Sequence, residues 1–150
     1  MYLIGIAVKS ERRKPLSPAR ICSVTKERGI EGDCRGAGRS KTRQVTVISL
    51  EQWIAACVEV GIDLPWHSRR AGLCINGHVF GPGDVGKRLC FPQGLVLEIT
   101  GETTPCSRMD EVCVGLKDAL TPDWRGGVTC KVIESGAIFI GDKITWNTSA

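Results

Sequence analysis

Short apolar runs, most of them closed by glycine or proline, recur along almost the whole chain. Runs of four to eight residues that are rich in valine, isoleucine, leucine and threonine are typical of β-strands. Their close spacing favours a closed or nearly closed β-barrel. We therefore predict a mainly β, β-barrel-like fold with one to three short helices, and strands at residues 2–9, 20–25, 44–50, 73–75, 87–91, 95–100, 127–134, 137–140 and 143–146.

Two segments depart from this β pattern. Ser49 and Gln52 have the spacing of a capping box, in which a serine and a glutamine bond each other's backbone at the start of a helix. We expect this helix to continue to about Val60 and to end at Gly61. Residues 103–120 are expected to be helical or irregular, and residues 10–18 to form a basic loop that contains proline.

The composition fits one globular domain. The chain has 150 residues, of which 42% are hydrophobic and 24% are charged, and it shows no internal repeat or linker. No apolar run approaches the roughly 20 residues of a membrane helix, and the first residues lack the pattern of a secretory leader. We therefore expect a single domain over residues 1–150 in a cytoplasmic protein that does not enter a membrane.

The charge balance is mildly basic, with 20 Lys and Arg against 16 Asp and Glu. A net charge of +4 suits an anionic small ligand better than a long polyanion, which usually calls for a dense basic face. Residues 29–43 combine four glycines with four basic residues, and two arginines follow at 69 and 70. These residues can bind phosphate or form an ordinary solvated loop; the candidates are Arg35, Arg39, Lys41, Arg43, Arg69 and Arg70.

Eight cysteines is a high number for this length, but none of them forms a C-x-x-C pair. With only two histidines as imidazole ligands, the sequence gives no support for a zinc finger or zinc ribbon. Without a secretory leader we expect most of the thiols to be reduced and buried. The two histidines are weak candidates for a catalytic base: His78 follows a turn and is expected at the surface, and His67 lies beside two arginines that could make its proton useful.

Cys106 is the cysteine with the most reactive setting. It follows a predicted strand and Pro105, and it precedes a predicted helical turn with Ser107 as a candidate cap. A helix start and the charge of Arg108 both favour a thiolate, which is the form that attacks sulfur, carries a persulfide or binds a soft metal. The alternative is a buried cysteine at a strand-to-helix corner. Cys113, seven residues later, is either a resolving thiol or structural.

The order of these features resembles the MOSC domain, named for the C-terminal domain of molybdenum cofactor sulfurase. Residues 29–33 resemble its G-x-x-G-D opening, residues 43–49 its R-Q-V strand and residues 70–77 its R-x-N-x-x-x-x-G segment. Residues 97–109 resemble its strand and cysteine loop, and residues 125–142 its glycine-rich end. The chain departs at Cys34 and Arg35, where many members have histidine, and at Gly72, which replaces the asparagine.

The resemblance implies a β-barrel-like fold and a role with molybdenum cofactor (molybdopterin) or activated sulfur. Cys106 is then the metal ligand or the catalytic thiol, and the expected cofactor-binding residues are Thr104, Cys106, Arg108, Arg43, Arg70, Arg35 and Arg39. A relative with such a centre reduces N-hydroxylated compounds, with electrons from a redox partner. The alternative is a sulfur carrier with a persulfide on Cys106, supplied by a partner cysteine desulfurase that holds the pyridoxal phosphate.

A third alternative is a non-enzymatic module that binds nucleic acid through the basic loop. Only 5% of the residues are aromatic, which leaves few rings for base stacking. Nucleic acid is therefore the least favoured partner.

Overall fold

The computed structural model describes residues 1–9, 17–32 and 41–147. Eight strands form one sheet in the order β11-β7-β8-β9-β5-β6-β1-β2, and β10-β3-β4 form a second, smaller one. In the large sheet, β5 and β6 are parallel and all other pairs are antiparallel. Its strands are β1 (Tyr2–Val8), β2 (Ser17–Ala19), β5 (Val45–Ser49), β6 (Leu73–Asn76), β7 (Arg88–Cys90), β8 (Val96–Glu102), β9 (Val128–Glu134) and β11 (Thr145–Asn147). Those of the small sheet are β3 (Ile21–Thr25), β4 (Gly29–Ile30) and β10 (Gly136–Phe139).

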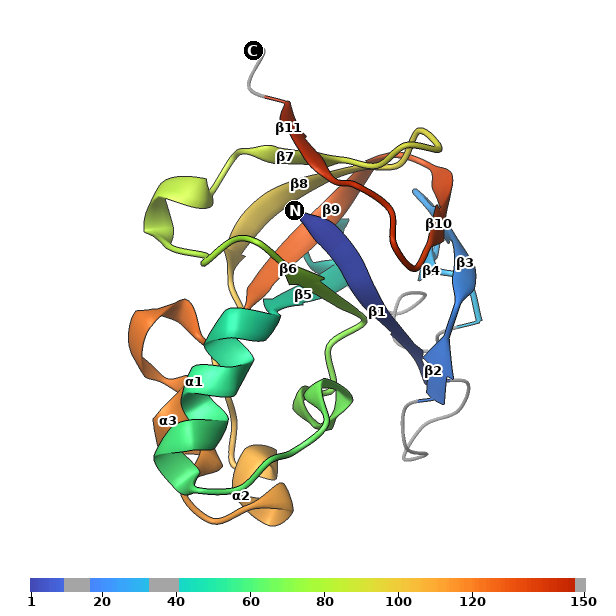
Figure 1. The fold of residues 1–150 in the computed structure, drawn as a ribbon. Helices are drawn as coiled ribbons and strands as arrows, with labels where there is room; N and C mark the ends of the chain where they lie inside the picture. Colours follow the sequence, from blue (N-terminus) through green and yellow to red (C-terminus); the bar gives the residue numbers. More distant parts are fainter. Residues whose placement is uncertain (10–16, 33–40, 148–150) are drawn as a thin grey trace.

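The large sheet curls back toward its own start, as Figure 1 shows. The backbone of Leu3 donates to Asp142 (2.9 Å) and accepts from Gly141 (2.8 Å), and Ile144 donates to Met1 (2.8 Å). The segment that leads into β11 therefore lies beside β1. This contact includes one isolated bridge, between Tyr2 and Lys143, so the described strands are not joined by a continuous ladder all the way round.

The main core fills the inside of this curled sheet. Its members are apolar residues that alternate with outward-facing residues along the strands, as expected for strands with one buried face. They include Leu3, Val47, Leu73, Leu97, Val128 and Ile138, all fully buried.

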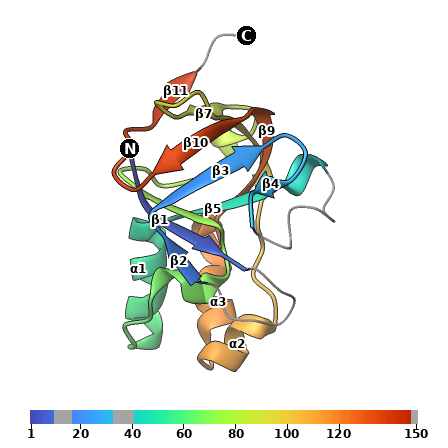
Figure 2. The ribbon, with the colours of Figure 1, turned by 90° about the vertical axis from the view of Figure 1, so that its right-hand side faces the viewer.

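The helices lie together at one end of the sheet (Figure 2). They are α1 (Leu50–Val60), α2 (Arg108–Val112) and α3 (Leu116–Leu120). A second apolar cluster, which includes Trp53, Met109 and Leu116, packs them against β5 and β6. No helix in the described part is long and apolar enough to cross a membrane.

The mainly β fold with three short helices confirms the prediction, with several local differences, among them β4 and the 3-10 helix Lys41–Arg43 in the expected loop 29–43. Residues 17–18, expected in a loop, belong to β2, where Pro18 pairs with Ala7 of β1. Proline is tolerated there because β2 is an edge strand and needs no second ladder partner. The helix start at Ser49 is correct, but only the serine half of the capping box forms: Ser49 Oγ accepts from the Gln52 backbone amide at 3.4 Å.

Candidate functional site

Cys106 lies in the loop that joins β8 to α2, and it is the one exposed cysteine among the described residues. The loop is anchored at both ends. The backbone amide of Thr103 donates to Gly127 (2.9 Å), and the carbonyl of Cys106 accepts from Met109 (3.0 Å) in the first turn of α2. Ser107 occupies the N-cap position, but its side chain makes no capping hydrogen bond. The thiol is therefore presented to solvent by a fixed backbone.

A buried arginine lies behind this loop. Arg69 ends the 3-10 helix Trp66–Arg69 and is only 7% exposed. Its Nε donates to the carbonyl of Gly126 (3.0 Å) and its Nη2 to the carbonyl of Thr103 (3.1 Å). Burial lowers the pKa of Arg69, and its electrostatic interaction with Cys106 opposes that shift. Arg69 thus provides a buried positive charge behind the loop of Cys106.

Close packing fixes the segments around this guanidinium. A Cβ at Gly126 would overlap the carbonyl oxygen of Thr103 and would lie 3.3 Å from Pro105 Cδ and 3.4 Å from Arg69 Nη2. Only glycine fits there. The hydroxyl of Thr103, in the same loop, is the one buried side-chain oxygen in the described part that has no hydrogen-bond partner.

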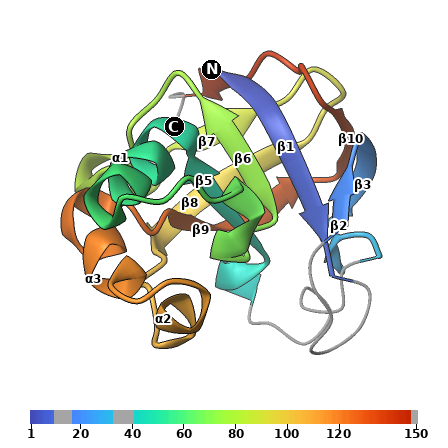
Figure 3. The ribbon, with the colours of Figure 1, turned by 60° about the horizontal axis from the view of Figure 1, so that its bottom comes forward.

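The other predicted residues fall into two groups. Thr104 and Arg108 are exposed and flank Cys106 along the chain. Arg43 is exposed and Arg70 is half-buried. Arg43 and Arg70 lie just before the starts of β5 and β6, which are paired in parallel with Val47 opposite Leu73. Figure 3 shows these two strands side by side.

The segment just before β5 also contacts β8, the strand that leads to Cys106. Thr100 Oγ1, three residues before Thr103, hydrogen-bonds the carbonyl of Thr42. Arg35 and Arg39 lie outside the described residues.

The sequence pattern grouped Arg69 with the candidate phosphate-binding residues and did not connect it with Cys106. Arg69 stands next to Arg70 in a basic pair, and nothing local distinguishes the two. Their burial differs because Arg70 adopts a left-handed conformation (φ 68°) at the end of the 3-10 helix, whereas the side chain of Arg69 is enclosed. The contacts of Arg69 are with residues 34 and 57 positions away.

The described residues include no group of three or more His, Cys, Asp or Glu side chains that could hold a metal ion. The other described cysteines are half-buried or buried, and no disulfide joins any of them. Burial raises the pKa of Cys74 to about 12 and raises that of Cys130 as well, so both stay protonated. The resolving role considered for Cys113 stays a prediction: this thiol is half-buried, and its Sγ donates to the carbonyl of Val114 (3.7 Å).

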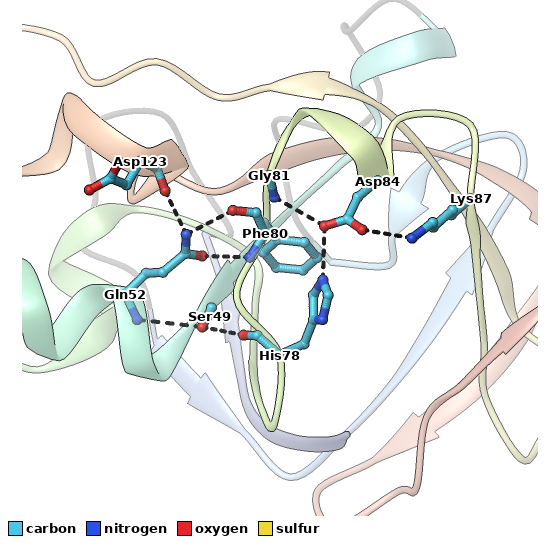
Figure 4. Close-up of polar contacts among 8 residues, drawn as sticks. All are labelled: Ser49, Gln52, His78, Phe80, Gly81, Asp84, Lys87 and Asp123. Atoms are coloured by element: carbon cyan, nitrogen blue, oxygen red, sulfur yellow. Dashed lines mark hydrogen bonds and ion pairs between the residues drawn. The ribbon is translucent and has the colours of Figure 1, made fainter.

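The histidines lie in other surroundings. His67 is half-buried, with its ring edge-on to Trp66 at 5.8 Å between centroids. His78, expected at the surface, is half-buried, and its Nε2 is 2.8 Å from Oδ2 of the buried Asp84 (Figure 4). Asp84 also accepts from the backbone amide of Gly81 (3.0 Å) and from Lys87 Nζ (3.2 Å). The His78 ring packs edge-on against Phe80 and Trp146, so this polar cluster joins the turn before β7 to β11.

Comparison with known proteins identifies proteins that are similar to this chain in sequence and in fold. No protein-family model matches the chain. The chain is 30% identical over 127 residues to YuaD of Bacillus subtilis (strain 168), which is provisionally named as a metal-sulfur cluster biosynthesis protein. The alignment covers 73% of this chain and 63% of YuaD.

Solved structures share the fold. A crystal structure of Bacillus subtilis YuaD has a TM-score of 0.80 at 21% identity and covers 99% of this chain and 96% of that chain. YiiM from Escherichia coli has a TM-score of 0.73 at 12% identity, with coverages of 100% and 71%. YiiM from Geobacillus stearothermophilus has a TM-score of 0.70 at 14% identity, with coverages of 97% and 72%.

Proposed function

Because the chain is a YuaD- and YiiM-like protein with the MOSC fold, we propose that Cys106 is its reactive residue and binds molybdenum, as a thiolate, within a pterin cofactor. The observation that carries this proposal is the exposed thiol held in front of the buried Arg69. A thiolate is a soft ligand, and soft ligands suit metals that are also bound by sulfur.

The donor set fits a cofactor that brings most of its own ligands. The described residues offer one exposed thiol and no group of three side chains able to hold a metal ion. When bound, the cofactor would supply the redox-active metal and its dithiolene sulfur ligands. The chain would contribute the remaining soft ligand from Cys106.

The cationic residues would hold the anionic parts of the same group. Arg43 and Arg70 precede neighbouring parallel strands, and Thr100 bonds the backbone beside Arg43. Guanidinium groups bind phosphate through paired hydrogen bonds, so the region before the starts of β5 and β6 is a candidate phosphate site. Thr104 and Arg108, which flank Cys106, would border the cofactor, and Arg35 and Arg39 are further candidates. The reaction that we propose is reduction of N-hydroxylated compounds, with electrons from a separate redox partner.

Elemental analysis tests this function. The protein is purified without oxygen from a host that makes the cofactor, and the wild type is compared with Cys106→Ser and Cys113→Ser. We expect about one molybdenum per wild-type chain, a similar amount in Cys113→Ser and a large loss in Cys106→Ser. Equal metal content in wild type and Cys106→Ser, or no metal in either, would contradict the proposal.

A second function is favoured by the exposure of Cys106 and by the naming of YuaD for metal-sulfur cluster biosynthesis. Here Cys106 carries a persulfide. Its thiolate attacks the outer sulfur of a donor persulfide, one sulfur–sulfur bond forms while another breaks, and the electron pair leaves on the donor thiolate. A pyridoxal-phosphate desulfurase with cysteine is the expected donor. Intact-mass analysis should show one added sulfur on Cys106 that a reductant removes; an adduct on another cysteine would contradict this site.

A further inference from the structure

The charge of Arg69 has no carboxylate to balance it among the described residues. Its two hydrogen-bond acceptors are the carbonyls of Thr103 and Gly126, which are neutral groups. Removing a cation from water without a counter-charge costs free energy, so buried charges are usually paired. An almost fully buried guanidinium whose acceptors are carbonyls therefore leaves a net positive potential in its surroundings.

That potential reaches solvent at Cys106. One acceptor of Arg69, Thr103, lies three residues before Cys106 in the same loop, and Arg69 interacts electrostatically with the Cys106 thiol. The other acceptor, Gly126, packs against Thr103 and Pro105 with no room for a Cβ. The guanidinium is thus held at a fixed place behind the loop. The charge of a solvated side chain would instead be screened by the surrounding water.

We propose that Arg69 is a positioning residue that makes the Cys106 thiol prefer anionic reaction partners over neutral ones. This inference rests on the proposed role of Cys106 as the reactive residue, but it does not depend on whether a metal or a persulfide is bound there. It narrows the chemical class of molecule that reacts at Cys106. Arg69 raises the reaction rate of a phosphate-bearing, carboxylate-bearing or persulfide anion, and it does not raise that of a neutral molecule.

Arg108 is the competing source of positive charge. It lies two residues after Cys106 and is exposed at the start of α2. Its charge is screened by water and salt more strongly than that of a buried group. A test therefore has to separate the two arginines.

The test compares two alkylating reagents on the metal-free full chain at one pH. Iodoacetate is an anion and iodoacetamide is neutral, and both consume the same thiolate. The ratio of their rate constants at Cys106 therefore cancels the fraction of thiol that is ionised, as well as its exposure. Peptide mass analysis assigns the modification to Cys106. The variants are Arg69→Gln, Arg69→Lys and Arg108→Met, and the matched control is Arg125→Gln, an arginine beside Gly126 whose charge pairs with Glu59 at 2.6 Å.

We expect the iodoacetate-to-iodoacetamide ratio to fall about three- to tenfold in Arg69→Gln, as estimated for one unit charge a few ångströms away at an intermediate dielectric constant. Arg69→Lys should keep most of the ratio because it keeps the charge, and Arg125→Gln should stay near wild type. An unchanged ratio in Arg69→Gln, or a fall in Arg108→Met alone, would overturn the proposal.

Circular dichroism shows whether Arg69→Gln folds. If it does not, a second measurement tests the proposal. The ratio of Arg108→Met, which lacks the exposed arginine but keeps Arg69, is then compared with that of a short unstructured peptide containing one cysteine. A higher ratio in the protein that declines toward the peptide value in about 0.5 M salt supports the proposal, because salt screens a charge interaction. A ratio equal to that of the peptide contradicts it. Neither result depends on molybdenum content, so failure here and failure of the metal proposal are separate outcomes.

Discussion

At the scale of single residues, Gly126 controls how closely the cysteine loop approaches Arg69. A Cβ at this position would overlap the carbonyl oxygen of Thr103 and press on Pro105. Overpacking of this kind costs about 1–3 kcal/mol because backbone has to move. We therefore expect Gly126→Ala to lower the free energy of unfolding by that amount, measured by urea denaturation, and to change the alkylation rate of Cys106.

Gly83→Ala is the matched control, because no atom lies within 4 Å of the added Cβ. Its free energy of unfolding should stay within about 0.5 kcal/mol of wild type, as for most surface substitutions. Equal losses in the two alanine variants would show that the contact with Thr103 is not the cause.

Asp84 gives the stability of the protein an acid-sensitive component. Burial disfavours its charged form, but hydrogen bonds from His78, the Gly81 amide and Lys87 outweigh this effect and hold the pKa of Asp84 below its usual value. A lowered folded-state pKa adds stability that is fully present above the pKa of an unfolded aspartate, about 3.9, and is lost as the pH falls through the folded-state value.

We expect Asp84→Asn to lower the free energy of unfolding by about 2 kcal/mol at neutral pH, since hydrogen bonds to a charged group are lost. Urea denaturation between about pH 2 and 7 should show this difference shrinking below about pH 4. The control is Glu134→Gln, which removes an exposed ion pair with Lys26 and should cost little. A difference that stays constant down to the lowest pH would contradict the role of the Asp84 charge.

At the scale of elements, Gln52 joins α1 to two loops. Its Nε2 donates to the carbonyls of Phe80 (3.0 Å) and Asp123 (2.7 Å), and its Oε1 accepts from the Phe80 amide (3.0 Å). Gln52→Ala would leave these buried backbone groups without partners, and we expect a loss of about 2–4 kcal/mol in urea denaturation. Val58→Ala, on the exposed side of the same helix, should change the stability little; a similar loss there would show that the lost hydrogen bonds of Gln52 are not the cause.

The same glutamine shows what local sequence can predict. The spacing of Ser49 and Gln52 correctly placed the start of α1, because a serine cap acts on the amide three residues ahead. The reciprocal half of the capping box is missing because the Gln52 side chain bonds residues 28 and 71 positions later. A four-residue pattern contains no information on such distant acceptors.

At the scale of the whole molecule, alternation along the chain predicted the strands well, but not their order. Nothing local indicates that β6 inserts between β1 and β5, or that residues 141–144 return beside β1. The candidate site divides in the same way. The position of Cys106 at a strand-to-helix turn could be predicted from its neighbouring residues. The position of Arg69 behind it could not, because it depends on how three distant segments pack.

The distribution of thiols over the whole fold gives a final prediction. Among the seven described cysteines Cys106 is exposed, and Cys57, Cys74 and Cys130 are buried. A buried thiol reacts only after the structure around it opens, which slows its modification by about a thousandfold or more in a stable domain. In a Cys34→Ser background, which removes the one cysteine outside the described residues, a disulfide reagent at neutral pH should therefore modify Cys106 first.

The three buried thiols should react only as fast as the structure around them unfolds. In denaturant, all remaining thiols should be modified at the same rate. Adding Cys106→Ser should abolish the first phase and leave the slow phase unchanged, which colorimetry and peptide mass analysis can measure. A fast phase that survives this substitution would place the most reactive thiol elsewhere. The result links the fold to the site, because Cys57 and Cys74 belong to the apolar cluster that also contains Met109, in the helix that follows Cys106.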